Sequence, residues 1–249
     1  MRNVFSKIPV RFAIVILSVL LAFSGIGTVK THAAGTSEDA EPYKSFNYSL
    51  IVTDYSTTIK GSKSTIPVKT YYMRLELSGK DAASKKINKA LKKIAKSYDP
   101  ANIISIANAM SEEYEAPKDT VYADRTLYDY TDSQIVYNDG QYLSVTVSRY
   151  WMAGGVGNTY NNGYTFDLKT GKRASITKIT GMSLDDIKTR LISNIAADGD
   201  GESYTADTIN NMKASDFRFY LKDGNQCVVT FEPYEVSFGG WCREYIIEY

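Results

Sequence analysis

Apolar and polar residues alternate in several short runs of the chain, and this alternation predicts β-strands. In the run 142–151, Leu143, Val145 and Val147 fall on one face, which is the expected core side. The sequence Asn138-Asp139-Gly140 before this run predicts a hairpin turn. Further strands are predicted at 46–54, 68–77, 121–130, 133–137, 164–168, 217–221, 226–231 and 244–248.

Other segments have the apolar spacing of helices. In the segment 81–98, Ile87, Leu91 and Ile94 lie on one stripe, and Asp81 is a good N-cap. Lysines cover the rest of this helix, which is typical of a solvated surface; attraction of anionic wall polymers is the alternative. Further helices are predicted at 101–113, 183–197 and 205–212. Because strands and helices occur in clusters, we predict an α+β fold, a mainly antiparallel sheet with helices packed on one side.

Glycine, asparagine and aromatic residues dominate the segment 150–163. We predict a hairpin loop from Gly154 to Gly163, longer than usual, and long loops more often carry function. Aromatic rings can stack on sugars, and amides supply donors and acceptors. The alternative is that the glycines and asparagines serve turns while the rings pack in the sheet. The candidate binding residues are Tyr150, Trp151, Asn158, Tyr160, Asn161, Asn162, Tyr164 and Trp241.

The N-terminus predicts export. Basic Arg2, Lys7 and Arg11 precede an apolar run, and a small-residue tail follows, which is the pattern of a secretory signal peptide. The alternative is an uncleaved anchor, although the apolar core is shorter than the roughly 20 residues that a span needs. We expect a secreted or envelope-associated protein with no stable membrane span after cleavage. The expected division is a signal peptide at 1–33, a flexible tether at 34–44 and a single domain at 45–249, with lobes at 45–172 and 173–249 as the alternative.

Removal of the leader would change the available chemistry. It takes His32, the only histidine, so Ser-His-Asp, Cys-His and histidine metal sites are not expected. It also takes four of the 29 basic residues, leaving 25 against 28 acidic ones, a formal net charge of −3 that does not suggest nucleic-acid binding. We expect no catalytic residue, no cofactor and no metal. Cys227 and Cys242 predict one disulfide, with two free thiols as the alternative.

Three segments resemble an extracellular domain of bacterial envelope proteins. They are Leu77-Ser-Gly79 before Lys86-Ile-Asn-Lys89, the Gly-Gly loop leading to Tyr164-Thr-Phe-Asp-Leu-Lys-Thr-Gly-Lys172, and Val229-Thr-Phe-Glu-Pro-Tyr-Glu235 followed by Gly239-Gly240. In this order and spacing they are similar to the extracellular domain of lysozyme-sensing anti-sigma factors and to the N-terminal accessory region of peptidoglycan deacetylases. The resemblance covers most of residues 45–249. Where these families often carry an Ala-His pair in the Gly-Gly loop, this chain has Val156-Gly157, so no role of that histidine is carried over.

The resemblance implies an α+β domain without catalysis of its own that is associated with the cell wall or with lysozyme. The expected function is therefore a secreted, non-catalytic binding domain that recognises peptidoglycan or a wall-active protein such as lysozyme. One alternative is a carboxylate-dependent glycan hydrolase, which would hold two carboxylates across a cleft. Another is a structural or assembly partner of a second envelope protein. The sequence does not specify an oligomeric state.

Overall fold

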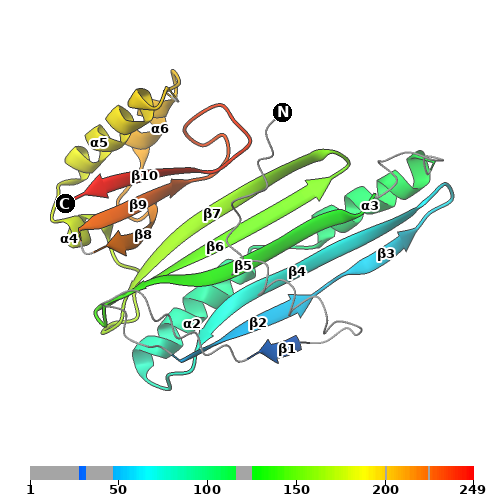
Figure 1. The fold of residues 1–249 in the computed structure, drawn as a ribbon, viewed down its shortest axis with the longest axis horizontal. Helices are drawn as coiled ribbons and strands as arrows, with labels where there is room; N and C mark the ends of the chain where they lie inside the picture. The colour runs from blue at the N-terminus through cyan, green and yellow to red at the C-terminus, as the bar shows by residue number, and fades with distance from the viewer. Residues whose placement is uncertain (1–27, 32–46, 116–124, 200, 224) are drawn as a thin grey trace, which may run out of the picture.

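A computed structural model describes residues 28–31, 47–115, 125–199, 201–223 and 225–249. The predicted leader and tether lie outside these residues, except for one short strand at 28–31. The described chain forms two β-sheets, with helices packed on both of them (Figure 1). The predicted α+β class, mainly antiparallel with helices packed on sheets, is confirmed.

The larger sheet, sheet A, has the strand order β1-β2-β4-β5-β6-β7, with β3 also paired to β4. Among the strand pairs of the described residues, β4–β5 alone is parallel, and α2 and α3 lie in the long connection that parallel strands require. Both helices pack on the same face of the sheet. The elements are β1 (Thr28–Thr31), β2 (Tyr48–Asp54), β3 (Thr57–Lys60), β4 (Thr65–Leu77), α2 (Ala82–Ala95), α3 (Ala101–Glu113), β5 (Leu127–Asn138), β6 (Tyr142–Ala153) and β7 (Val156–Asp167).

The start of α2 follows from its capping residue. The Asp81 carboxylate accepts hydrogen bonds from the Ser84 N–H at 2.9 Å and from the Ser84 hydroxyl at 2.6 Å. Buried Ile87 and Leu91 then pack against a core cluster of sheet A that includes Leu75. The predicted helix at 81–98 is thus confirmed over Ala82–Ala95, and its apolar stripe faces the sheet.

The smaller sheet, sheet B, has the order β10-β9-β8. Three buried residues of α5, namely Ile187, Leu191 and Ile195, belong to its core cluster. Two other α5 side chains reach the outer strand, since Asn194 donates to the carbonyl of Ile246 at 3.1 Å and Arg190 to that of Glu248 at 2.9 Å. The elements are α4 (Ile176–Thr180), α5 (Leu184–Ala197), α6 (Thr205–Asn211), β8 (Arg218–Asp223), β9 (Gln226–Phe231) and β10 (Arg243–Glu248).

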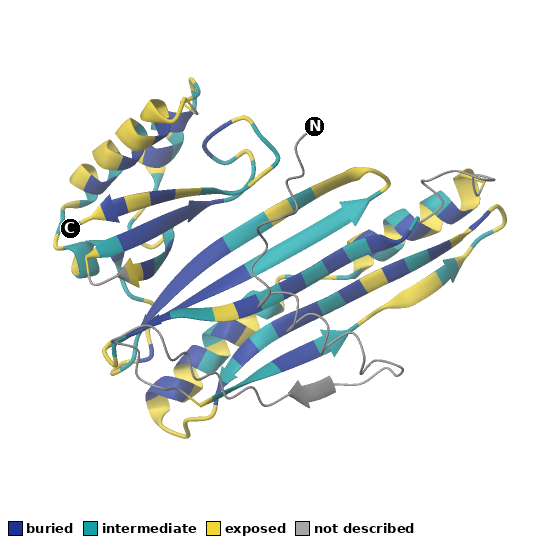
Figure 2. Ribbon diagram, in the orientation of Figure 1, coloured by how far each residue is buried: buried dark blue, intermediate teal, exposed yellow. Residues whose placement is uncertain are grey.

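The two sheets meet through side-chain hydroxyls rather than through strand pairing. The Leu221 N–H of β8 donates to Ser144 Oγ at 3.0 Å, and Thr165 Oγ1 donates to the carbonyl of Phe219 at 3.1 Å. The two hydroxyls also share a hydrogen bond of 2.9 Å. Because sheet B covers this face, the polar side of β6 is buried here as well as the apolar side (Figure 2). We call this contact the hydroxyl seam.

The predicted long hairpin loop is wrong. Strands β6 and β7 pair as far as Ala153 and Val156, so only Gly154 and Gly155 form the turn. Their φ angles of 63° and 90° are the positive values that a type I′ turn needs at both central residues. The glycine- and asparagine-rich segment from Val156 to Gly163 is therefore the first part of β7.

Two other predictions at the element level need correction. The two strands predicted at 121–130 and 133–137 are one strand, β5, with a register shift between Ile135 and Tyr137; residues 121–124 lie outside the described residues. The short helix α4 was not predicted, because five residues are too few to show helical periodicity.

Candidate functional site: an exposed aromatic loop

The three candidate asparagines of β7 contact the C-terminal segment of the chain. Asn162 donates to Glu232 Oε1 at 3.1 Å, and Asn161 donates to the Glu244 carboxylate. The Asn158 amide, in the orientation that satisfies both of its polar atoms, donates to the carbonyls of Gly157 and Gly240. These amides therefore hold the segment 232–244 against β7, and in this structure the protein itself occupies their donors.

The candidate rings of β6 and β7 lie on both faces of sheet A. Tyr150 is on one face, where its ring lies 5.3 Å from that of Tyr130. Trp151 is on the opposite face because side chains alternate along a strand. Tyr160 and Tyr164 share the face of Trp151, since they pair with Arg149 and Val145, which lie an even number of positions from Trp151. Tyr164 is buried in the core cluster below α2. The structure thus does not bring these four rings together into one surface.

Arg149, which is also on β6, explains why Tyr160 is half-buried. Its guanidinium makes two hydrogen bonds of 2.8 Å to the buried carboxylate of Asp129. The guanidinium carbon lies 5.4 Å from the ring centre of Tyr98 and 5.9 Å from that of Tyr160. The hydrogen bonds that Arg149 donates to Asp129 raise the pKa of Arg149, while burial raises the pKa of Tyr98. Tyr160 therefore closes a packed ion-pair cluster.

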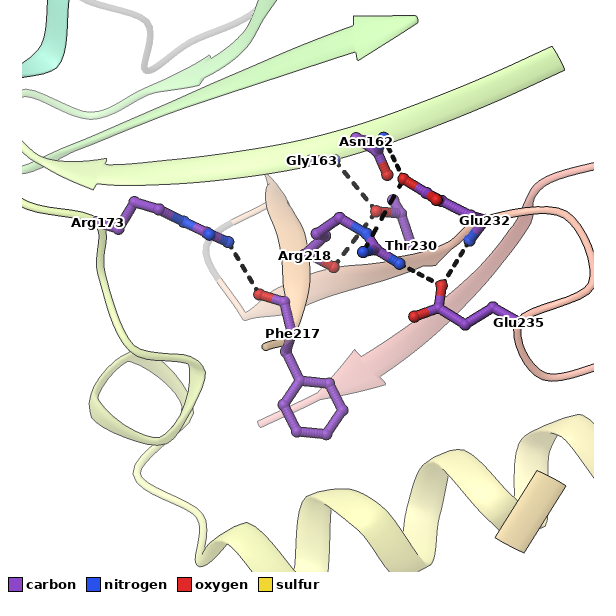
Figure 3. A network of polar contacts seen from close by, with 8 residues as sticks. All are labelled: Asn162, Gly163, Arg173, Phe217, Arg218, Thr230, Glu232 and Glu235. Atoms are coloured by element: carbon purple, nitrogen blue, oxygen red, sulfur yellow. Dashed lines mark hydrogen bonds and ion pairs between the residues drawn. The ribbon is translucent and has the colours of Figure 1, made fainter. Parts of the chain in front are cut away.

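A second polar network lies where β7 meets sheet B (Figure 3). Arg218 pairs with the Glu235 carboxylate and lies 4.0 Å from Glu232. The Glu232 N–H donates to Glu235 Oε2 at 2.7 Å. Burial raises the pKa of Glu235, and the charge of Arg218 acts against that shift. Both carboxylates lie on one turn beside one guanidinium, whereas a glycan hydrolase holds its two carboxylates on either side of the substrate.

The residues between β9 and β10, 232–242, form a loop that we call the aromatic loop. Three of its rings are largely exposed, with exposed fractions of 60% for Tyr234, 68% for Phe238 and 57% for Trp241. In Figure 2 the same loop alternates between exposed and buried residues. It is thus a folded loop that presents aromatic side chains to solvent.

Buried contacts fix the backbone of the aromatic loop. Val236 is fully buried, and its carbonyl accepts a 2.6 Å hydrogen bond from the hydroxyl of Thr205 at the start of α6. Trp241 forms a parallel bridge with Thr159 on the outer edge of β7. The guanidinium of Arg243 lies 4.9 Å from the Trp241 ring. Of the candidate residues, only Trp241 belongs to this exposed group.

Sequence reasoning missed Tyr234 and Phe238. The signal was present, because an 11-residue connection with three rings and a Gly-Gly pair joins two predicted strands. The run of asparagines and glycines at 154–163 resembles a long loop in sequence, but it contains a two-glycine turn followed by a strand. Beside the end of the loop lies a hollow of about 460 Å³, lined by Asp198, Cys242, Arg243, Glu244 and Tyr245.

The predicted disulfide is not formed, since both cysteines are free. Cys227 pairs with Ile247 at one end of the β9–β10 ladder, whereas Cys242 precedes Arg243 at the other end. Ile247 is five positions after Cys242 along extended chain, which is roughly 16 Å at the rise of a strand. The Cα atoms of a disulfide lie no more than about 7 Å apart, so the bond cannot form in this register.

Within the described part of the chain, no helix has both the length and the apolar character to cross a membrane. No family model matches the chain, and no curated protein matches it. Among solved structures, the chain is similar to a DUF3298 family member from Bacteroides fragilis NCTC 9343, with a TM-score of 0.44 and 11% identity, over 80% of this chain and 90% of that chain.

A second similar structure is a DUF3298 family protein from Pseudomonas aeruginosa PAO1. Its TM-score is 0.41 and its identity 11%, and the match covers 79% of this chain and 89% of that chain. The structural neighbours of this chain are thus DUF3298 family proteins, at a level of similarity that does not itself assign the chain to the family.

Proposed function

We propose that the chain is a secreted, non-catalytic binding domain of a bacterial cell envelope. Its ligand is peptidoglycan or a wall-active protein such as lysozyme, and the aromatic loop is the contact surface. The observation that carries the proposal is the exposure of Tyr234, Phe238 and Trp241 on one loop with a fixed backbone. The leader-like N-terminus and the resemblance to lysozyme-sensing and wall-associated domains support the compartment and the ligand class.

These side chains can bind a ligand at a low entropic cost. Tyrosine and tryptophan offer large rigid surfaces, and aromatic anchors contribute much of the binding energy in many interfaces. Because Val236 and Trp241 already fix the loop backbone, binding would order little additional chain. The loop could therefore stack on sugar rings or enter a groove of a protein without refolding.

A carboxylate-dependent glycan hydrolase is the second candidate. It is favoured by one observation, that Asp198 and Glu244 line the same hollow beside the aromatic loop. Glu244 already accepts a hydrogen bond from Asn161 and one of 3.2 Å from the hydroxyl of Tyr220. Release of reducing ends from peptidoglycan, with loss of that activity in both Asp198→Asn and Glu244→Gln, would establish the hydrolase instead of the binding domain.

The test uses the purified chain with two immobilised targets. One is peptidoglycan stripped of its anionic polymers, and the other is lysozyme; the measured quantity is the fraction of protein retained. We expect one target to retain the wild-type chain. We expect Trp241→Ala and Phe238→Ala to weaken that binding about tenfold or more, as for hot-spot residues.

The matched control is Tyr114→Ala, which removes a ring with an exposed fraction of 55% at the end of α3. This variant should bind like the wild type. If neither target retains the wild-type chain, the proposed function is wrong. If the two loop variants bind as well as Tyr114→Ala, the aromatic loop is not the contact surface.

A further inference from the structure

Helix α2 and its C-cap residue together carry six exposed lysines on one side. At 100° per residue all six fall within an arc of about 120°, opposite the buried Ile87 and Leu91. The arc runs for about 16 Å along the helix. We call this group the lysine stripe; it consists of Lys85, Lys86, Lys89, Lys92, Lys93 and Lys96.

The lysine stripe concentrates like charges, and the acids that flank it along the chain, Asp81 and Asp99, form no ion pair with it among the described residues. Helix α2 has no acidic residue, and within the described residues none of the six lysines forms an ion pair. Lys89 has stripe lysines both three and four positions away in each direction, and like charges at these spacings destabilise a helix. The remaining 23 basic residues of the chain are outnumbered by 28 acidic ones, so the chain is locally basic at α2 and has a formal net charge of −5 elsewhere.

The turn after β7 widens this basic surface. Gly171 fits against the start of α2, where a Cβ would lie 2.5 Å from the carbonyl oxygen of Ala83. Lys86 Nζ also donates to the carbonyl of Thr170 at 3.3 Å. The turn thereby places exposed Lys169 and Lys172 next to the stripe.

The nearest acid of this turn does not neutralise the stripe. Asp167 Oδ2 pairs with Lys178 at 3.2 Å, on the side of α4. Its other oxygen, Oδ1, accepts hydrogen bonds from the N–H groups of Lys169 and Thr170. Both oxygens of the Asp167 carboxylate are therefore already paired, one with Lys178 and the other with N–H groups of the turn.

We propose that the lysine stripe binds a linear phosphodiester polymer, the chemistry of anionic wall polymers. A row of cations along a convex helix can neutralise successive phosphates of one polymer chain and release its bound counterions. A planar anionic membrane fits less well, because α3 packs on the same face of sheet A. That helix has no lysine or arginine and ends with exposed Glu112 and Glu113.

The experiment measures the affinity of the purified full chain for soluble poly(glycerol phosphate) by fluorescence anisotropy. We expect binding that weakens steeply between about 50 mM and about 200 mM NaCl, because counterion release drives it. The triple variant Lys89→Gln, Lys92→Gln and Lys93→Gln should lose about tenfold or more in affinity at the lower salt. It should melt at the wild-type temperature or above, since charge repulsion on the helix is reduced.

The matched control removes three exposed lysines from other surfaces, as Lys60→Gln, Lys63→Gln and Lys213→Gln. It has the same net charge as the stripe variant and should keep most of the affinity. Equal losses in the two variants, or no binding by the wild type, would overturn the proposal. Stripe-dependent binding to phosphatidylglycerol vesicles without polymer binding would overturn it in favour of a membrane. Trp241→Ala should bind the polymer normally, so this test and that of the aromatic loop can fail separately.

Discussion

Single residues show how closely the two sheets approach each other, and Gly163 is the clearest case. A Cβ at this position would lie 2.6 Å from the carbonyl carbon of Phe219 and 2.7 Å from the nitrogen of Tyr220. Both are backbone atoms, which cannot rotate away as a side chain could. The Gly163 N–H also donates to Thr230 Oγ1 at 3.1 Å. Glycine is needed here for space, and the contact sets the distance between β7 and β8.

We expect Gly163→Ala to lower the free energy of unfolding by roughly 1–3 kcal/mol, the usual range for overpacking. Urea denaturation followed by circular dichroism measures the change. Thr159→Ala, on the exposed part of the same strand, should change it by less than about 0.5 kcal/mol. Equal stability of the two variants would mean that the sheets can separate at Gly163 without cost.

At the scale of elements, the β6–β7 hairpin depends on its two-glycine turn. Gly155 has a φ of 90°, and an added Cβ would meet no atom within 4 Å. The cost of Gly155→Ala is therefore a backbone cost, of about 1–2 kcal/mol in the free energy of unfolding. Gly155→Asn should cost less, since asparagine tolerates positive φ. Chemical denaturation of both variants measures the difference, and equal costs would argue against a conformational origin.

The start of α2 gives a prediction that depends on pH. The hydroxyl of Ser84 and then its N–H lower the pKa of Asp81 by hydrogen bonding to the carboxylate. A pKa that is lower in the folded state means that the ionised carboxylate stabilises the fold above its unfolded pKa of about 4, and that this contribution is lost as the pH falls further.

We therefore expect Asp81→Ala to melt below the wild type at neutral pH, with the difference vanishing at about pH 2. A series of thermal melts at different pH values measures this, with Ser105→Ala on the exposed side of α3 as the control. A constant difference at every pH would show that the charge of Asp81 does not contribute.

The sequence predicted those elements that have a clear local signal. The predicted ranges of α3 and β9 agree with the structure, since a proline precedes the helix and apolar residues fill the strand. It failed in β7, where Asn158, Asn161 and Asn162 contact residues 70 or more positions away. Local pattern cannot show such long-range contacts, and the run was therefore interpreted as a loop. For the same reason the candidate site was only partly predicted, through Trp241.

At the scale of the whole molecule, the hydroxyl seam joins the two sheets, and the chain has one tryptophan on each side of it. Trp151 is in β6 of sheet A, and Trp241 is in the aromatic loop of sheet B. In Trp151→Phe the remaining Trp241 reports by fluorescence the loss of the aromatic loop and of its bridge to Thr159. In Trp241→Phe the remaining Trp151 reports the unfolding of sheet A.

We expect both single-tryptophan variants to give the same urea midpoint, because the seam couples the sheets in one transition. Adding Ser144→Ala and Thr165→Val leaves the Leu221 N–H and the Phe219 carbonyl unpaired, at about 1–3 kcal/mol for each buried group. Both midpoints should then fall. If the two single-tryptophan variants have different urea midpoints even with Ser144 and Thr165 intact, the domain consists of lobes that fold independently.

Side chains also cover the outer backbone groups of both edge strands of sheet B, β8 and β10. Ser144 and Thr165 occupy backbone groups of β8, while Asn194 and Arg190 occupy carbonyls of β10. An edge strand with unpaired N–H and C=O groups is a template on which another chain can add a strand and begin to aggregate. Two of the three strands of sheet B are edge strands, so covering their outer backbone groups matters more here than in a wide sheet. The contacts that attach sheet B to the rest of the molecule thus also protect it from self-association.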